Sequence, residues 1–283
     1  MIKVQSSWEL SRRTLSLDRP LVMGILNVTP DSFSDGGRFF SLDAAVERAQ
    51  EMEREGADII DIGGESTRPH APAVELAREL DRVIPVIEAL AGKISVPISI
   101  DTYKAGVARA ACAAGAEIVN DVTGLMADPD MARVTAEADA GLVVMHTRGM
   151  PETMQADTGY DDLIGDVKRY LEKSIAVALV AGVKAGRIVV DPGLGFGKSV
   201  QGNLELIRRL EEFLPLGCPI LVGPSRKSFV GAVTGREGGE RIFGTAAAVA
   251  LSIVHGAAIV RVHDVAAMRD VAVMTRALLR QPE

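Results

Sequence analysis

Short apolar runs rich in valine and isoleucine recur along the whole chain. They span residues 21–26, 58–62, 97–100, 117–119, 142–145, 187–190, 219–222 and 258–262. The segments between them space their apolar residues as helices do and carry charged opposite faces, as at 42–55, 73–90, 104–114, 161–181, 203–213 and 265–279. Continuous apolar strands that alternate with such helices are typical of a parallel sheet covered by helices.

Glycines mark the junctions of this alternation. Helices should end and strands begin at Gly56, Gly115, Gly141, Gly182 or Gly186, Gly217 and Gly256, as helix C-caps require. Eight strands and eight helices within 283 residues predict an α/β protein with a single (β/α)8 TIM barrel, its core at about residues 21–280. We predict one domain over residues 1–283, in which the short segment before Leu21 covers the barrel bottom. A doubly wound open sheet is the alternative.

Composition narrows the class of partner. The chain carries 31 Lys and Arg against 38 Asp and Glu, a formal charge of −7, which argues against nucleic acid or an anionic membrane as the partner. The N-terminus lacks the apolar core of a secretory signal. Cys112 and Cys218 are too far apart to form a zinc or redox motif, so we expect a cytoplasmic protein.

One uncharged stretch has about the length of a membrane span. Residues 242–260 contain no Lys, Arg, Asp or Glu. His255 and Gly256 divide the stretch into an alanine-rich part and a short β-branched part. We therefore predict a buried helix followed by a buried strand.

Polar side chains stand at the carboxyl end of every predicted strand. They are Asn27, Asp61, Asp101, Asn120 with Asp121, His146, Asp191, Ser225-Arg226-Lys227, and Arg261 with His263. Asp and Asn also favour ordinary turns after strands. Eight such ends meet on one face of a barrel, however, and that face holds the active site of TIM barrels. The pattern predicts an enzyme or a ligand-binding barrel.

The acceptors in this set suggest the chemistry of the ligand. Asp61, Asp101, Asn120 and Asp191 suit a flat heterocycle that presents several N–H groups. Buried together, these acids need cations or ligand donors nearby.

The cations suggest one or two anionic groups beside that heterocycle. Lys227 opens a predicted helix, whose N-terminus with Ser225 and Ser228 can seat an anion. Asn27, Thr67-Arg68 and His263 form a second candidate seat, and Arg261 adds charge to the same end.

The glycine-rich run at 193–199 looks like a phosphate loop but does not fit one. Pro192 stands where a P-loop needs glycine, so we interpret the run as a tight turn that presents Phe196. The sequence has no His and Cys cluster for a metal. Any metal would be a hard cation on oxygen ligands, completed by substrate phosphates.

Two long motifs resemble the signatures of the dihydropteroate synthase family. The first covers residues 23–37 and the second residues 58–69. Shorter matches follow at 99–102, 119–122, 145–146, 191–198, 225–228 and 261–264. The resemblance runs in unbroken order from about Leu21 to Arg276.

The resemblance implies a reaction and its participants. The family consists of pterin-binding TIM barrels that condense 6-hydroxymethyl-7,8-dihydropterin diphosphate with 4-aminobenzoate, giving 7,8-dihydropteroate and pyrophosphate. It uses Mg²⁺, acts on small molecules and not on nucleic acid or membranes, and forms homodimers.

The resemblance also implies roles for particular residues. The pterin would contact Asp101, Asn120, Met145, Asp191, Lys227 and Arg261. The diphosphate would contact Asn27, Thr67, Arg68, Arg261 and His263, and Asn27 would also bind Mg²⁺. The aminobenzoate would contact Phe33, Pro69, Phe196, Lys227 and Ser228. The implied catalytic residues are Asp101, Lys227, Arg261 and His263. Mobile loops that hold Asp31, Phe33, Asp35 and Arg68 would close over the site.

A dissociative substitution follows as a hypothesis, in which pyrophosphate leaves, a pterin methylene cation forms and the neutral arylamine attacks it. Two departures from the family pattern stand out. His70 replaces a frequent glycine, and Gly202-Asn203 replaces a common His-Asn pair. We place Gly202-Asn203 on the outer side of the barrel, away from the chemistry.

Two other functions remain open. One is a pterin-binding methyltransferase acting on methyltetrahydrofolate, which shares the heterocycle clamp but needs no diphosphate seat. The other is a pterin-binding protein without catalysis.

Overall fold

The core of the molecule is a closed barrel of eight parallel strands, as the computed structural model shows for residues 5–29, 42–67, 71–150 and 152–279. Neighbouring strands follow the order β10-β3-β4-β5-β6-β7-β8-β9. They are β3 (Leu21–Asn27), β4 (Ile59–Gly63), β5 (Ile98–Asp101), β6 (Ile118–Asp121), β7 (Gly141–Met145), β8 (Ile188–Asp191), β9 (Ile220–Val222) and β10 (Ala257–Val262). The closed barrel confirms the predicted fold and excludes the open sheet.

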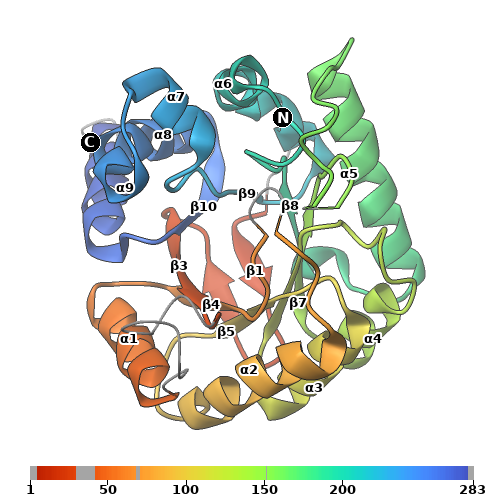
Figure 1. Cartoon of the computed structure of the whole chain (residues 1–283). Coiled ribbons are helices and arrows are strands. Elements are labelled where there is room, and N and C mark those ends of the chain that lie inside the picture. The colour runs from red at the N-terminus through yellow and green to blue at the C-terminus, as the bar shows by residue number, and fades with distance from the viewer. Residues whose placement is uncertain (1–4, 30–41, 68–70, 151, 280–283) are drawn as a thin grey trace.

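Helices surround these strands on the outside (Figure 1). They are α1 (Leu42–Arg54), α2 (Leu76–Leu90), α3 (Ala105–Ala114), α4 (Met131–Glu137), α5 (Leu163–Val180), α6 (Val200–Arg208), α7 (Ser228–Thr234), α8 (Ile242–Val254) and α9 (Val265–Leu279). The helix expected at 203–213 divides into α6 and a 3-10 helix, Leu210–Leu216, which contains Pro215. The uncharged stretch at 242–260 forms α8 and most of β10, which confirms a helix followed by a strand. The helix was predicted to be buried, but it is buried on one face only, since Phe243, Leu251 and Val254 are exposed. In the described ranges no helix has both the length and the apolarity of a membrane span.

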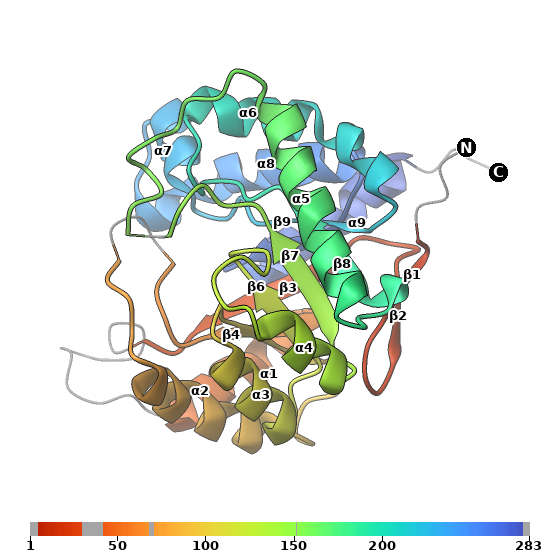
Figure 2. The ribbon, with the colours of Figure 1, turned by 90° about the vertical axis from the view of Figure 1, so that its right-hand side faces the viewer.

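A hairpin of β1 (Ser7–Glu9) and β2 (Thr14–Ser16) covers the end of the barrel where the strands begin (Figure 2). Trp8 is fully buried against the first residues of the strands, and its indole Nε1 donates to the carbonyl of Arg187 at 2.8 Å. The predicted cover of the barrel bottom is therefore confirmed.

One of the predicted junction glycines, Gly141, does not cap a helix. Left-handed φ angles occur at Gly56, Gly115, Gly182, Gly217 and Gly256, as helix C-caps require. Gly141 instead opens β7, where a Cβ atom would lie 2.5 Å from Leu10 Cδ2. The prediction of a C-cap at Gly141 was wrong, because this glycine makes room for the hairpin.

The alternation of side chains along each strand brings the polar residues inside the barrel. Successive residues of a strand point to opposite faces. Ile60 and Ile62 pack outward under the helices, whereas Ile59 belongs to the apolar cluster inside the barrel. Asp61, two residues after Ile59, therefore points inward. The same spacing carries Asn120, Met145, Asp191 and Arg261 inward, above Ile118, Val143, Val189 and Ile259.

Candidate active site

The inward residues at the carboxyl ends of the strands meet in a buried polar layer. Strand register pairs Asn27 with Gly63, Gly63 with Asp101, and Asp101 with Asn120. Met145 pairs with Asp191 across β7 and β8. Side chains that lie far apart in the sequence thus face one another at the same height.

Arg261 is the central cation of this layer. Its Nε donates to Asp61 Oδ2 and its Nη2 donates to Asp101 Oδ2, both at 2.6 Å. Asn120 Nδ2 also donates to Asp61 Oδ2, at 3.1 Å. One guanidinium therefore joins two carboxylates from neighbouring strands, and the two carboxylates in turn fix its orientation.

The second oxygens of the two carboxylates remain available. Asp61 Oδ1 and Asp101 Oδ1 are buried and accept no hydrogen bond from any residue that the structure describes. Burial raises the pKa of Asp101 to about 7, although the charge of Arg261 opposes that rise. A buried carboxylate oxygen without a partner is costly. This pair of oxygens therefore suits a ligand that brings N–H donors.

Asp191 supplies a third acceptor. Its Oδ1 accepts from the backbone N–H of Gly193 at 2.7 Å. Burial raises the pKa of Asp191 to about 6, against the lowering effects of that hydrogen bond and of the nearby cations. Together with Asp101 and Asn120 it lines the predicted heterocycle site.

The glycine-rich turn at 193–197 places Phe196 under Lys227. Phe196 is buried with Met145, and its ring centroid lies 4.0 Å from Lys227 Nζ. Desolvation lowers the pKa of Lys227 to about 8. The interpretation of this run as a turn presenting Phe196 is confirmed, because the ammonium of Lys227 stacks on that ring.

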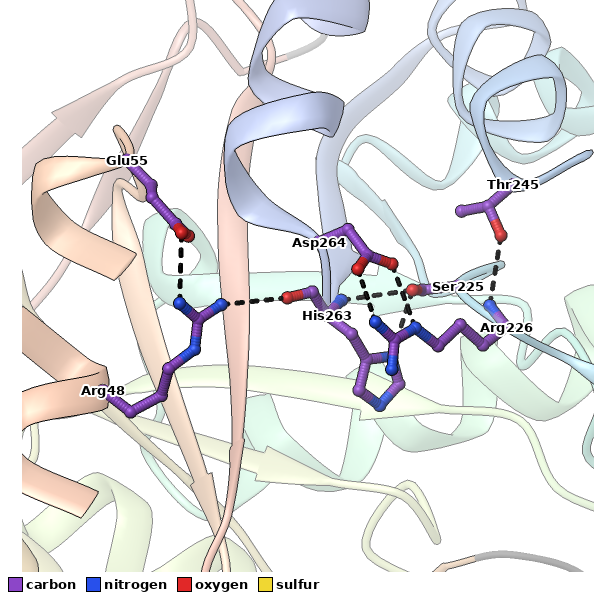
Figure 3. Close-up of polar contacts among 7 residues, drawn as sticks. All are labelled: Arg48, Glu55, Ser225, Arg226, Thr245, His263 and Asp264. Atoms are coloured by element: carbon purple, nitrogen blue, oxygen red, sulfur yellow. Dashed lines mark hydrogen bonds and ion pairs between the residues drawn. The ribbon is translucent and has the colours of Figure 1, made fainter. Parts of the chain in front are cut away.

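A second group of residues forms the side of the site near the ends of β9 and β10 (Figure 3). Ser225 Oγ accepts from the His263 backbone N–H at 3.1 Å and lies 3.0 Å from His263 Nδ1. The hydroxyl hydrogen can thus go to Nδ1, which leaves Nε2 as the protonated nitrogen. Burial lowers the pKa of His263 to about 3, so the imidazole is neutral and can donate to an anion through Nε2.

Arg226 forms an ion pair that connects this side of the site to the residue before α9. Its Nε donates to Asp264 Oδ2 at 3.0 Å, and its Nη2 contacts Asp264 Oδ1 (Figure 3). The backbone of Arg226 has φ +56°, a left-handed conformation that is uncommon without glycine. Its N–H donates to Thr245 of α8 at 3.2 Å. These contacts hold the bend between Ser225 and Lys227.

The remaining predicted residues divide into two groups. Asn27 and Thr67 are half-buried at the ends of β3 and β4, and Ser228 is exposed at the first residue of α7. Five others lie outside the described residues, namely Asp31, Phe33, Asp35, Arg68 and Pro69, as does His70.

Asn203 lies on α6, outside the barrel strands as predicted, but it is not remote from the site. The side chain is buried, and its Oδ1 accepts from Gly195 N at 2.6 Å while its Nδ2 donates to the carbonyl of Ser199 at 2.8 Å. Although Asn203 lies on α6, its side chain reaches back to the turn that carries Phe196. The helical periodicity predicts which face of α6 carries Asn203, but it does not predict that this face packs against the turn at 193–197.

Sequence reasoning also missed two charged side chains near the site, the buried Lys198 and the half-buried Lys104. Lys198 is buried behind the glycine-rich turn, and Lys104 bridges Glu65 and Glu79 beside the end of β4. The glycine-rich run that ends in Lys198 was the only sequence signal for the position of Lys198. No spacing in the sequence links Lys104 to two glutamates so distant from it.

The donors present suit a hard cation with few protein ligands. No group of three or more His, Cys, Asp or Glu side chains capable of holding a metal occurs in the described part of the chain. Asn27 offers an amide oxygen at the mouth of the barrel. Mg²⁺ is commonly held by one or two protein oxygens together with water and substrate phosphates, so this donor set fits it.

Fold and site together define a TIM-barrel enzyme with a buried cluster of acids, amides and cations at the carboxyl ends of its strands. A model of the family described as pterin binding enzyme matches residues 23–263. The dihydropteroate synthase of Synechocystis sp. is 49% identical to this chain over 263 residues, which cover 93% of this chain and 91% of that protein. The chain belongs to the dihydropteroate synthase family.

Solved structures of dihydropteroate synthases also match this chain in fold and sequence. The Xanthomonas albilineans dihydropteroate synthase with 4-aminobenzoic acid is 45% identical and matches with a TM-score of 0.92, covering 99% of this chain and 100% of that chain. The same organism's enzyme in complex with 7,8-dihydropteroate is 43% identical, with a TM-score of 0.89, covering 98% and 100%.

Proposed function

We propose that this enzyme condenses 6-hydroxymethyl-7,8-dihydropterin diphosphate with 4-aminobenzoate and releases 7,8-dihydropteroate and pyrophosphate. The observation that carries the proposal is the Asp101 carboxylate. One of its oxygens is held by Arg261, and the other is buried without a partner among the described residues. A pterin ring offers the N–H groups that such an oxygen needs. The relatives solved with 4-aminobenzoic acid and with 7,8-dihydropteroate support the same pair of ligands.

The pterin binds among the inward residues of the buried polar layer at the carboxyl ends of the strands. Asp101, Asn120 and Asp191 pair with the edge of the ring, and Met145 and Arg261 lie against its faces. Lys227 donates to the ring from above Phe196. In-plane hydrogen bonds fix the ring so that its methylene carbon points to the mouth of the barrel.

The diphosphate binds toward β3, β4 and β10. Asn27, Thr67 and Arg68 contact it from one side, and Arg261 and His263 from the other. His263 donates from Nε2 because Nδ1 faces Ser225 Oγ. Mg²⁺ would be held by Asn27 and by diphosphate oxygens, where it would neutralise charge on the leaving group.

The aminobenzoate binds outside the pterin, against Phe33, Pro69, Phe196, Lys227 and Ser228. Its carboxylate reaches the exposed Ser228 end of that group, and its amine faces the pterin methylene carbon. Asp31, Asp35 and Arg68, which lie outside the described residues, are assigned the task of keeping water from the reacting carbon.

The reaction is a dissociative substitution. The methylene carbon–oxygen bond breaks first, and its electron pair leaves with pyrophosphate. The pterin ring spreads the resulting positive charge, and the ionised Asp101 stabilises it electrostatically. The neutral amine nitrogen then forms the new carbon–nitrogen bond and loses a proton to solvent. No protein nucleophile takes part, so a covalent pterin–protein adduct detected during turnover would contradict this scheme.

We further propose a homodimer that forms through the outer faces of α7, α8 and α9. Large apolar side chains gather there with high exposure, including Phe243 at 85%, Met274 at 59% and Leu278 at 74%. The helices α8 and α9 pack against each other, and large exposed apolar side chains on neighbouring helices favour an interaction site. Sedimentation equilibrium should give a dimer for the native chain and a monomer for Phe243→Glu. A native monomer at micromolar concentration would refute the assembly.

We place the protein in the cytoplasm. Cys112 and Cys218 are both free thiols, and free thiols suit a reducing compartment.

The test of the function is pyrophosphate release from the purified chain with Mg²⁺. Release that requires both the pterin diphosphate and 4-aminobenzoate is the expected result. Tight binding of methyltetrahydrofolate without any pyrophosphate release would instead favour the methyltransferase. Binding of the pterin without turnover would favour a non-catalytic pterin-binding protein.

A further inference from the structure

Lys198 is a buried lysine to which the proposed mechanism gives no task. Its side chain is only 4% exposed. Its Nζ donates to the carbonyls of Gly193 and Phe196, both at 2.8 Å, and lies 2.9 Å from His146 Nδ1. Burial and the charge of Lys198 lower the pKa of His146 to about 2, so the neutral imidazole can accept at Nδ1. Three acceptors thus satisfy the three donors of the ammonium.

Three neutral side chains hold the same turn. Asn203 Oδ1 accepts from Gly195 N at 2.6 Å, and Gln155 Nε2 donates to the carbonyl of Gly195 at 3.0 Å. The hydroxyl of Tyr160 donates to the carbonyl of Gly197 at 2.9 Å. The turn therefore already has neutral hydrogen bonds on both sides, and Lys198 adds a positive charge to them.

The turn determines where Lys227 lies. The ring of Phe196 supports Lys227 Nζ at 4.0 Å. A Cβ atom on Gly195 would come within 2.8 Å of Lys227 Cδ, so the backbone of the turn also touches the stem of that lysine. A shift of the turn therefore moves Lys227.

A single residue, Gly193, links the buried charge of Lys198 to Asp191. Lys198 Nζ donates to the carbonyl of Gly193 at 2.8 Å, and the backbone N–H of Gly193 donates to Asp191 Oδ1 at 2.7 Å. Desolvation lowers the pKa of Lys198 to about 7, and the negative charge of Asp191 opposes that fall. In return, Lys198 favours the ionised form of Asp191, together with the Gly193 N–H, Lys227 and Arg261. A neutral glutamine at position 198 could keep part of the hydrogen bonding but would remove this charge.

We propose that Lys198 is a positioning residue of the reaction, which fixes the Phe196 turn against Lys227 and supplies the buried positive charge that keeps Asp191 able to accept a pterin N–H. The proposal deepens the proposed function and rests on it. Lys198 therefore has two effects, one on the geometry of the Phe196 turn and one on the charge near Asp191, and substitutions can separate them.

The experiment compares Lys198→Gln with Asn203→Ala and Tyr160→Phe, which loosen the same turn without changing its charge. Calorimetry measures the affinity for 6-hydroxymethylpterin from about pH 5 to about pH 9. This probe carries no phosphate, so the titration of a substrate phosphate does not interfere. Steady-state rates at about pH 6, where Lys198 with its pKa of about 7 keeps its proton, give the KM for 4-aminobenzoate with each variant.

The expected result separates the two effects. All three variants raise the KM for 4-aminobenzoate, and Lys198→Gln does so about tenfold. Only Lys198→Gln moves the acid-side loss of pterin affinity to higher pH, by about half a unit or more, because Asp191 then holds its proton more tightly. A wild-type pH profile for Lys198→Gln would overturn the proposal. An equal shift in Asn203→Ala would also overturn it, since that shift would arise from loop geometry alone.

Two controls keep the proposal falsifiable. Should Lys198→Gln not fold, Lys198→Arg keeps the charge and is expected to raise the KM for 4-aminobenzoate with the pH profile unchanged; a shifted profile would contradict the assignment. A wild-type chain that neither binds the pterin nor releases pyrophosphate would refute the proposed function itself. Normal wild-type behaviour with an unaltered Lys198→Gln variant would refute only the role of Lys198.

Discussion

The interior of the barrel has two layers that differ sharply in chemistry although they lie only two residues apart along each strand. The lower layer is apolar and consists of Ile59, Ile118, Val143, Val189 and Ile259, closed from below by Trp8. The upper layer is polar and consists of Asp61, Asp101, Asn120, Met145, Asp191 and Arg261. The same backbone geometry thus supports a core below and a site above.

Stability and function depend on different layers of this barrel. Trp8 is fully buried and its one polar hydrogen is satisfied, so this side chain stabilises the fold from the lower end of the barrel. The upper layer buries Asp61 Oδ1 and Asp101 Oδ1 without a partner among the described residues, which opposes folding until a ligand binds. Functional sites commonly cost stability in this way.

The largest effect is expected for Arg261→Leu, which removes the cation of the upper layer. Turnover should fall by more than about a thousandfold, because the pterin clamp and the diphosphate seat both lose this charge. Removing one partner from a buried ion pair should also lower the free energy of unfolding by about 3 kcal/mol at neutral or higher pH. Steady-state assays and urea unfolding measure the two effects.

The pH dependence of this variant has a definite sign. The pKa of Asp101 is already raised to about 7 in the folded protein, well above the value of an unfolded chain. The folded state therefore takes up a proton first as the pH falls, and the unpaired charge disappears. The destabilisation by Arg261→Leu should be largest above pH 7 and smaller below it. A loss that grows toward low pH would contradict this account of Asp101.

Trp8→Ala tests the lower layer. Truncation of this buried indole should lower the free energy of unfolding by at least about 3 kcal/mol. The KM values should stay within about twofold of the native values, because the substitution lies at the opposite end of the barrel from the site. Trp8→Phe serves as the control, since it keeps an aromatic ring and loses mainly the hydrogen bond to Arg187. A large change in KM in Trp8→Ala would show that the two layers are coupled.

The smallest effect is expected at Arg226, at the edge of the upper layer. Arg226→Ala loses the ion pair with Asp264 and keeps a side chain in a left-handed conformation, so kcat/KM should fall about tenfold. Arg226→Gly loses the same ion pair but adopts that conformation freely, and it should retain more activity than the alanine variant. Equal rates in the two variants would show that the backbone conformation at this position does not contribute.

The sequence predicted the upper layer well because barrel geometry needs only strand ends and a period of two. Strands of 3–7 residues with polar carboxyl ends are enough to place Asp101, Asn120 and Asp191 together. The partners of these residues were less predictable. Nothing in the local pattern indicates that Arg261 joins Asp61 to Asp101, because that contact depends on closing the barrel between its last strand and its first ones.

Side chains that support the site from behind escaped prediction for a related reason. Asn203 and Lys198 lie in an ordinary helix start and a glycine-rich turn, and their burial depends on how α6 packs over the end of β8. Local periodicity describes one element at a time, whereas these contacts join two. Gly141 was misassigned for the same reason, since its neighbour is the N-terminal hairpin.

The most direct test is the formation of 7,8-dihydropteroate by the purified chain and by its Lys227→Ala variant. We predict that the native chain forms it together with an equal amount of pyrophosphate, and that the variant loses more than about a thousandfold in rate. The variant should unfold at the same or a higher temperature, because desolvation already lowers the pKa of the Lys227 ammonium to about 8 and so disfavours its charge in the fold. Near-native turnover in Lys227→Ala, or no product from the native chain, would contradict the account.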